Sequence, residues 1–196
     1  YEMAFCDWSS DVCSSDLIKK VLITEEQIRK RVEELGAQIS EDYAGKELVV
    51  IFVLKGASIF FADLIRSIVV PIRIDSIAAA SYGNTTKSSG TVRIEKDIET
   101  PIEGKHVLLV EDIIDTGLTL SYLKAYFERQ KPASLRVITL LDKPVARKVQ
   151  LVPDYNGFTV GNEFVVGYGL DYAQRFRNLP YIAIPKDYVW NDEEKE

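Results

Sequence analysis

The sequence predicts an α/β fold in which a mostly parallel sheet is flanked by helices. Four short apolar runs are rich in β-branched residues and are typical of buried strands: 47–54, 71–80, 107–110 and 135–141. Segments with apolar residues at helical spacing alternate with several of these runs, which indicates βαβ units. No repeat, linker or low-complexity segment interrupts this order, so we expect one folded domain over 18–196.

The first helix is predicted to begin at a capping box, in which Gln27 follows Thr24 by three residues. Apolar residues then recur at helical spacing as far as about residue 43: Ile28, Val32, Leu35 and Ile39. The strand at 47–54 leads through a turn at 55–58 into a second helix. The apolar residues of that helix are Phe60, Phe61, Leu64, Ile65 and Ile68.

A polar segment at 81–90 separates two further predicted strands, 71–80 and 91–98. Its Ser, Gly, Asn and Thr residues are frequent in turns, so we expect a mobile loop or the tip of a hairpin. A turn at 100–104 then precedes the most apolar strand of the chain.

That strand begins near His106 and is predicted to end in two adjacent carboxylates, Glu111 and Asp112. A short polar turn and a helix at about 119–130 follow it. We interpret His106 as a structural residue on the solvent side, because it lies at the far end of the strand from the acids. No second histidine exists, so a Ser-His-Asp triad is excluded.

Three predicted strands end in polar residues: Lys55-Gly56, Glu111-Asp112 and Asp142-Lys143. Ligands of open α/β sheets bind beyond the carboxyl ends of the strands, so we expect these residues at one rim. Later strands are predicted at 164–168 and 181–184.

The composition is that of a globular protein, with 46% hydrophobic and 28% charged residues and a net charge of −6. This charge gives no support for a nucleic-acid-coating surface. No apolar run reaches the roughly 18–20 residues that span a bilayer, so we expect no membrane partner.

Residues 1–17 have no helical or strand period, and from Asp7 onward they look like the in-frame translation of a sequencing-adapter oligonucleotide. We interpret them as an artefactual tail; a natural disordered tail is the alternative. Both cysteines, Cys6 and Cys13, lie there, so the rest of the chain can form no disulfide framework, which fits the cytosol. Without the four acids of the tail the net charge is −2.

The turn that follows the acid pair has the composition of a phosphate site. From Asp115 to Thr119 it can offer successive backbone N–H groups and the hydroxyls of Thr116 and Thr119. A plain helix cap is the alternative, because Asp and Thr are good N-cap residues. Adjacent buried carboxylates need a partner such as sugar hydroxyls or a divalent cation, although a solvated strand end is also possible. The pattern predicts a phosphorylated sugar or nucleotide as the ligand.

The run Glu-Asp-Ile-Ile-Asp-Thr-Gly at 111–117 resembles the phosphoribosyl-pyrophosphate motif of type I phosphoribosyltransferases, and its wording is similar to the hypoxanthine-guanine branch. Further landmarks agree from about residue 18 to 189: Leu54-Lys55-Gly56, Ser81-Tyr82, Leu141-Asp142-Lys143, 164–172 and Phe176-Arg177. The resemblance implies the type I phosphoribosyltransferase fold, with a small hood and a flexible loop.

The resemblance also implies a division of roles within the motif. Asp115 would be the general base near the purine N7. Glu111 and Asp112 would bind the ribose hydroxyls and Mg²⁺. The residues implied in binding the phosphoribosyl group are Glu111, Asp112, Ile114, Asp115, Thr116, Gly117, Leu118 and Thr119.

Residues outside the motif complete the implied site. Lys143, Phe164 and Val165 would contact the purine, Lys143 at the exocyclic 6-oxygen; a surface lysine and a core aromatic are the alternatives. Asp171 is implied in the same part of the site and as ligand of a second Mg²⁺ that carries pyrophosphate. The residues implied in binding pyrophosphate are Lys55, Gly56, Ser81, Tyr82 and Arg177. The loop at 81–90 would close over the site as a lid, unless it is an ordinary exposed loop.

The family resemblance implies a pentosyltransferase that makes IMP or GMP and pyrophosphate from phosphoribosyl pyrophosphate and hypoxanthine or guanine. Mg²⁺ is the implied cofactor, the cytoplasm the implied location, and a homodimer or homotetramer the implied assembly. Two alternatives stay open: a relative that prefers xanthine, and a regulator that keeps the phosphoribosyl site but binds nucleic acid. The near-neutral body speaks against the regulator.

Overall fold

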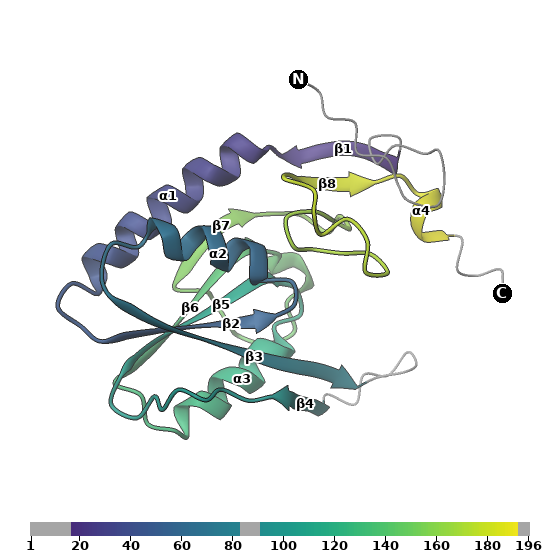
Figure 1. The fold of residues 1–196 in the computed structure, drawn as a ribbon. Coiled ribbons are helices and arrows are strands. Elements are labelled where there is room, and N and C mark those ends of the chain that lie inside the picture. The colour runs from purple at the N-terminus through teal and green to yellow at the C-terminus, as the bar shows by residue number, and fades with distance from the viewer. Residues whose placement is uncertain (1–16, 83–90, 192–196) are drawn as a thin grey trace. The chain divides into compact units, whose positions relative to one another are not determined.

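The computed structural model describes residues 17–82 and 91–191 (Figure 1). Apart from Leu17, the segment 1–17 that we interpret as an artefact lies outside the described residues. Residues 83–90 of the lid expected at 81–90 lie outside them as well. The elements are, in chain order, β1 (Ile18–Ile23), α1 (Glu25–Asp42), β2 (Leu48–Leu54), α2 (Ser58–Ser67), β3 (Ile72–Tyr82), β4 (Thr91–Lys96), β5 (His106–Ile114), α3 (Leu118–Glu128), β6 (Ser134–Asp142), the 3-10 turn η2 (Pro144–Ala146), β7 (Tyr155–Thr159), β8 (Ile182–Pro185) and α4 (Tyr188–Asn191).

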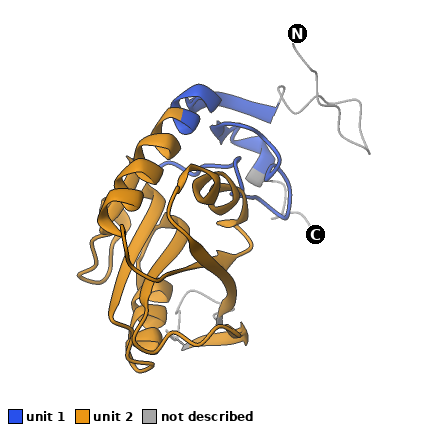
Figure 2. Ribbon diagram, turned by 60° about the vertical axis from the view of Figure 1, so that its left-hand side comes forward, with its two compact units in different colours: residues 1–29, 163–196 blue, residues 30–162 orange. Residues whose placement is uncertain are grey.

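The chain forms two compact units (Figure 2). The larger unit comprises residues 30–162, and the smaller one joins residues 1–29 to residues 163–196. Whether residues 18–196 behave as one domain stays a prediction.

The larger unit contains a six-stranded sheet with the strand order β4-β3-β2-β5-β6-β7. All neighbouring pairs are parallel except β3 and β4, which form an antiparallel pair at the edge. The sequence therefore predicted the mostly parallel sheet correctly. It did not predict β7, because the short run Tyr-Asn-Gly-Phe-Thr carries no clear strand period.

Helices cover both faces of this sheet: α1 and α2 lie on one face and α3 on the other (Figure 1). Alternate residues of a strand point to opposite faces, so a strand buried on both sides reads as a continuous apolar run. β2 shows this, because Val49, Ile51 and Val53 join one core cluster with Leu123 and Phe127 of α3. The sheet is thus held rigidly from both sides, which fixes the positions of its strand ends.

The predicted capping box begins α1. The backbone N–H of Thr24 donates to Gln27 Oε1 at 2.8 Å, and the N–H of Gln27 donates to Thr24 Oγ1 at 3.3 Å. The reciprocal bonds satisfy two amides that would otherwise lack a helical partner, so this prediction is confirmed.

The smaller unit is built on an antiparallel pair, β1 and β8, and a small apolar cluster that includes Val166, Phe176 and Leu179. The strand predicted at 164–168 is wrong: Val166 and Gly167 form only isolated bridges, to Ala183 and to Leu170. Positive φ angles at Gly167, Tyr168 and Gly169 turn the chain away from an extended path. The sequence did not predict β1, whose three middle residues are exposed.

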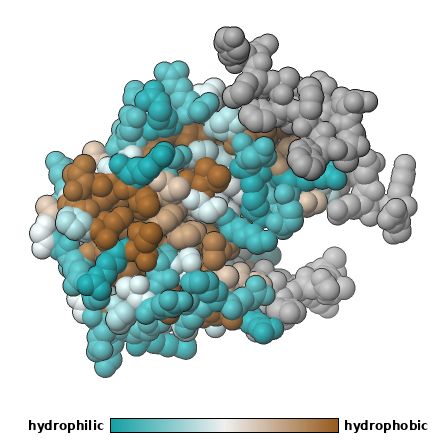
Figure 3. Space-filling model, viewed as in Figure 1, coloured by the Kyte–Doolittle hydropathy of each residue, from teal (hydrophilic) through white to brown (hydrophobic). Residues whose placement is uncertain are grey.

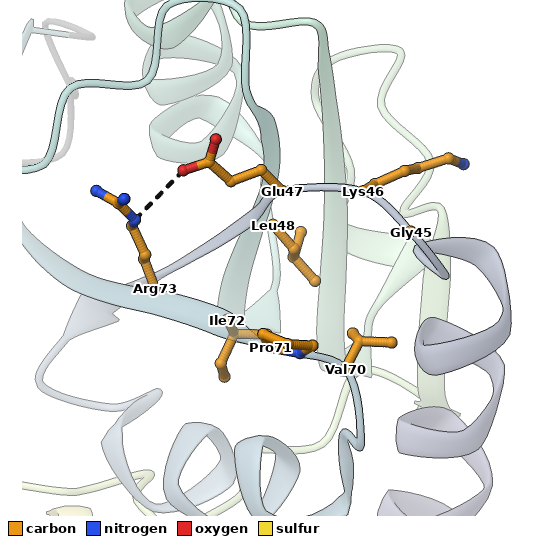
Figure 4. Close-up of a pocket in the computed structure, with 8 residues that line it drawn as sticks. All are labelled: Gly45, Lys46, Glu47, Leu48, Val70, Pro71, Ile72 and Arg73. Carbon is orange, nitrogen blue, oxygen red and sulfur yellow. Dashed lines mark ion pairs between the residues drawn. The ribbon is translucent and has the colours of Figure 1, made fainter.

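A pocket of about 420 Å³ lies at the amino ends of β2 and β3 (Figure 4). The ion pair between Arg73 and Glu47, with 3.3 Å between nitrogen and oxygen, crosses its rim, and Leu48, Val70 and Ile72 are among its apolar lining. Apolar side chains also gather where α2 ends and β3 begins (Figure 3). This is the end of the strands opposite to the polar rim. No helix among the described residues is long and apolar enough to cross a membrane.

Candidate active site

The carboxyl ends of β2, β5 and β6 form the polar rim of the larger unit. The three strands are parallel neighbours, with Phe52 beside Val110 and Ile114 beside Asp142. Parallel strands end at the same edge of a sheet, so the residues that follow β2 and β6 lie at the same edge as the end of β5. The structure confirms the shared rim for the predicted residues of this unit.

β5 is longer than the sequence indicated. It does not end at Glu111 and Asp112 but continues to Ile114, whose carbonyl accepts the N–H of Lys143 at 3.0 Å. Cross-strand pairing with β6 extends the strand past the acids. Both carboxylates therefore sit on rigid sheet rather than on the turn.

In the turn between β5 and α3, the N-cap residue of α3 provides no side-chain cap. Gly117 is the N-cap residue, with φ of +78°, and no side chain bonds to the first helical amides from that position. The alternative in which Asp115 is the N-cap is therefore wrong. Thr116 Oγ1 lies 3.4 Å from the N–H of Leu118, a long contact that an incoming anion could replace. The N-terminus of α3 is suited to an anion.

The surroundings of the acid pair disfavour the ionised form of Glu111 in the free protein. Glu111 and Asp112 are both half-buried. Burial, and then the neighbouring Asp112 carboxylate, raise the pKa of Glu111 well above its ordinary value. A cation, or hydroxyl groups that donate hydrogen bonds, would relieve both effects, so the pair is suited to these ligands.

We predict that Glu111→Gln stabilises the free protein. When the pKa of a carboxyl is raised in the folded state, the protein loses stability as the pH rises through that folded-state pKa. Removing the charge of this carboxyl therefore stabilises the protein at neutral and higher pH. We expect the melting temperature at pH 8 to rise by about 2–4 °C, which corresponds to roughly 1 kcal/mol for a chain of this size. The gain should vanish below about pH 4, where the glutamic acid becomes neutral in the unfolded state as well as in the folded state.

Calorimetric melting curves of Glu111→Gln at several pH values would test this. The exposed Glu103 offers a matched control, since Glu103→Gln removes a carboxylate that faces water. An unchanged or lower melting temperature for Glu111→Gln at pH 8 would contradict the argument.

The loop after β2 lies directly against the acid pair. A Cβ built on Gly56 would stand 1.5 Å from Asp112 Oδ2 and 2.6 Å from its Cγ. Asp112 also accepts the N–H of Ile113 on Oδ1 at 2.7 Å, which fixes the carboxylate. Lys55 is exposed beside it, and the Leu54–Lys55 peptide bond is cis. The structure therefore brings Lys55, Gly56 and Asp112 together, as the sequence predicted for this rim.

Lys143 follows β6 and is buried, with only 9% of its surface exposed. Lysines are almost never this buried unless they have a partner or a function. The alternative of a surface lysine is therefore wrong. Its backbone bond to Ile114 ties it to the strand that carries the acids.

In the smaller unit, Asp171 and Arg177 form an ion pair with 2.7 Å between Asp171 Oδ1 and Arg177 Nη2. Asp171 Oδ2 accepts the N–H of Gln174 at 2.8 Å, and Arg177 Nη1 donates to the carbonyl of Gly169 at 2.6 Å. The two residues thus order one loop together.

The aromatic residue predicted near the purine lies at the edge of the small apolar cluster of this unit. Phe164 is half-buried and packs edge-on against Tyr172, with 5.8 Å between ring centroids. Val165 beside it is buried. Both precede the isolated bridge at Val166, so neither is part of a strand, contrary to the sequence prediction.

Ser81 and Tyr82 are the last two residues of β3 rather than the head of a loop. Pairing with Val92 and Thr91 of β4 extends the strand to this point, and the side chains of Ser81 and Tyr82 lie outside the described set. Nothing in the sequence indicated that Arg147 and Val149 would lie near the turn between β5 and α3. A Cβ on Gly117 would lie 3.0 Å from Arg147 Cδ and 2.9 Å from Val149 Cγ2, so both residues lie against the turn.

The donor groups at the rim suit Mg²⁺ that arrives with a substrate. Among the described residues no group of three acids, histidines or cysteines is placed to hold a metal. Mg²⁺ commonly uses one or two carboxylates together with substrate phosphates and water. Glu111 and Asp112 fit that arrangement.

Comparison with known proteins decides the family. The model of the phosphoribosyl transferase domain matches residues 22–173 of this sequence. The chain belongs to the phosphoribosyltransferase family. The fold class predicted for this phosphoribosyltransferase is thereby confirmed.

Similar proteins cover nearly the whole phosphoribosyltransferase chain. The hypoxanthine-guanine phosphoribosyltransferase of Bacillus subtilis is 52% identical over 173 residues, which make up 88% of this chain and 96% of that protein. The Streptococcus pneumoniae (strain R6) protein of the same name is 47% identical over 175 residues, or 89% of this chain and 97% of its own. The crystal structure of a hypoxanthine phosphoribosyltransferase from Staphylococcus aureus has a TM-score of 0.88 and 44% identity, and covers 94% of this chain and 99% of that one.

Proposed function

We propose that this phosphoribosyltransferase transfers the 5-phosphoribosyl group from phosphoribosyl pyrophosphate to hypoxanthine or guanine, forming IMP or GMP and pyrophosphate. The observation that carries the proposal is the N-terminus of α3, which has no side-chain cap from its N-cap residue Gly117 and directly follows the strand with Glu111 and Asp112. Such an arrangement suits a sugar phosphate. Relatives named for this reaction match the chain over nearly their full length.

In the proposed reaction a purine nitrogen bonds to C1 of the ribose while the bond from C1 to pyrophosphate breaks. The amides at 116–119 hold the 5-phosphate, and Glu111 and Asp112 hold the ribose hydroxyls. Mg²⁺ supplies charge neutralisation for the departing pyrophosphate. Asp115, exposed on the turn, accepts the proton that leaves the purine N7, and its negative charge also favours an oxocarbenium-like sugar.

The choice of purine is proposed to depend on Lys143. A buried ammonium can donate to the 6-oxygen of hypoxanthine or guanine, whereas adenine presents an amino group there. Phe164 is proposed to stack on the base, and the backbone of Val165 to meet its edge.

Pyrophosphate is proposed to bind Lys55 and Gly56, with Ser81, Tyr82 and Arg177 as further contacts. Asp171 is proposed to reach a second Mg²⁺, for which its present pairing with Arg177 has to be shared or exchanged. We place the enzyme in the cytoplasm as a homodimer or homotetramer, and light scattering in solution would test the assembly.

Turnover of phosphoribosyl pyrophosphate and Mg²⁺ with a panel of bases tests the proposal. We expect IMP from hypoxanthine and GMP from guanine, and no product from adenine or uracil. A marked preference for xanthine would replace the proposed substrate, and turnover with no purine would overturn the reaction itself. Binding titrations with duplex DNA and with RNA would test the alternative function, a regulator that binds nucleic acid.

We predict that Lys143→Met lowers kcat/KM for hypoxanthine about 10- to 100-fold, while the KM for phosphoribosyl pyrophosphate changes little. Methionine keeps the apolar stem but leaves the 6-oxygen without a donor, a loss of about 1.5–3 kcal/mol for a hydrogen bond to a charged group. Steady-state kinetics with each substrate varied in turn would measure this. Lys131→Met, at an exposed lysine before β6, is the control, and equal losses in both variants would contradict the role of Lys143.

A further inference from the structure

Arg147 is a half-buried charged residue that has no role in the proposed reaction. It directly follows η2, and only 12% of its side chain is exposed. It forms an ion pair with Asp142, the last residue of β6, whose side chain is 14% exposed. Replacing a buried ion pair by apolar residues often leaves a protein equally stable, so stability alone is a weak explanation for this pair.

The guanidinium joins three segments of the larger unit. Nη2 bonds to Asp142 Oδ1 and also lies 3.4 Å from the carbonyl oxygen of Ile114, where β5 ends. Nη1 donates to the carbonyl of Leu151 at 2.6 Å. A planar fork of donors can reach several oxygens at once, which a lysine cannot do.

These contacts lie directly against the turn at 115–117, which is proposed to bind the 5-phosphate. The Cδ atom of Arg147 stands 3.0 Å from the position that a Cβ on Gly117 would take. The next residue, Lys148, donates its N–H to the carbonyl of Thr116 at 2.9 Å. The segment 147–149 is thus the support on which the turn at 115–117 rests.

We propose that Arg147 is a positioning residue for the 5-phosphate site, and that it acts by holding the turn at 115–117 against the end of β6. The proposal rests on the proposed function, because it assumes that this turn binds the phosphate. Arg147 itself is not placed against the substrate. Substitution of Arg147 should therefore weaken the binding of ligands that contact the turn. It should leave unchanged the binding of ligands that contact the loop after β2.

Two ligands separate these parts of the site. Ribose 5-phosphate is proposed to bind the turn at 115–119, whereas pyrophosphate is proposed to bind Lys55 and Gly56. Isothermal titration calorimetry should show that Arg147→Lys weakens ribose 5-phosphate binding about tenfold or more and leaves pyrophosphate binding in Mg²⁺ within about twofold, since small displacements of a binding element cost this much or more. A general loss of folding would lower the binding affinity for both ligands to the same extent.

A double variant distinguishes a direct effect on ribose 5-phosphate binding from a loss of folding stability. Arg147→Met alone leaves the half-buried Asp142 without its ion-pair partner, so we expect this variant to fold poorly. Asp142→Leu with Arg147→Met removes both charges, so we expect its melting temperature to return close to that of the unmodified protein. Ribose 5-phosphate affinity should stay reduced, because the contact with the Ile114 carbonyl is still missing.

Arg136→Met is the matched control, since Arg136 lies near the other end of β6 from Asp142 and pairs with Asp42 at 2.8 Å. It should lower stability and leave both affinities unchanged. Full ribose 5-phosphate affinity in Arg147→Lys and in the double variant would overturn the role of Arg147 alone. Failure of the unmodified protein to bind ribose 5-phosphate would overturn the phosphate site as well.

Discussion

Replacing Asp115 by asparagine is expected to lower kcat for IMP formation by about 10²- to 10⁴-fold, the range typical of a lost general base. Asparagine has nearly the same shape, but it can neither accept the N7 proton nor offer a negative charge to the sugar. Asp115 is exposed on the turn and is not the N-cap residue of α3, so the substitution should leave the helix intact.

Single-turnover measurements with both substrates saturating would isolate the chemical step from product release. We expect the affinity for phosphoribosyl pyrophosphate to stay within a few-fold, because the amides of the turn remain. Asp187→Asn is the control, since Asp187 is an exposed carboxylate paired with Lys19. Turnover of Asp115→Asn equal to that of the unmodified enzyme would show that another group accepts the proton.

Placing a methyl group on Gly56 is expected to raise the KM for phosphoribosyl pyrophosphate by about 10²-fold, the effect of misplacing a binding group by roughly 1 Å. The new Cβ would stand 1.5 Å from Asp112 Oδ2, far inside contact distance. Either the Asp112 carboxylate or the loop after β2 must then move. Both are proposed to hold the substrate, so Gly56→Ala should damage binding more than folding.

Steady-state kinetics and melting curves of Gly56→Ala would test this, with Gly104→Ala as the control. Gly104 has a φ of +71° and open space around its Cβ position, so alanine there should cost stability and leave the KM unchanged. Combining Gly56→Ala with Asp112→Ala should cost much less than the sum of the two single changes, because they disturb the same contact. Full additivity would mean that Asp112 does not transmit the effect.

Much of the fold was predictable because it depends on local patterns. The capping box at Thr24 places the start of α1, and the apolar runs place β2, β5 and β6, since a strand buried on both faces must be apolar throughout. β1 and β7 could not be predicted in this way. Their residues are mixed in polarity, and pairing with neighbours distant in sequence makes them strands.

The sequence by itself determined which groups gather at the carboxyl ends of the parallel strands. The run from Glu111 to Gly117, together with Lys55, Gly56 and Lys143, indicated acids, an anion-binding turn and a cation at the ends of parallel strands. Residue type and position along a strand decide this much, because parallel strands end at a common edge.

Only the tertiary structure decided how these groups constrain one another. It showed that Lys143 is buried, that Gly56 leaves room for the Asp112 carboxylate, and that Arg147 supports the turn through Asp142 and Ile114. It also gave the raised pKa of Glu111. Burial, close approach and ion pairing depend on distances between residues far apart in the chain, and no local pattern in the sequence encodes those distances.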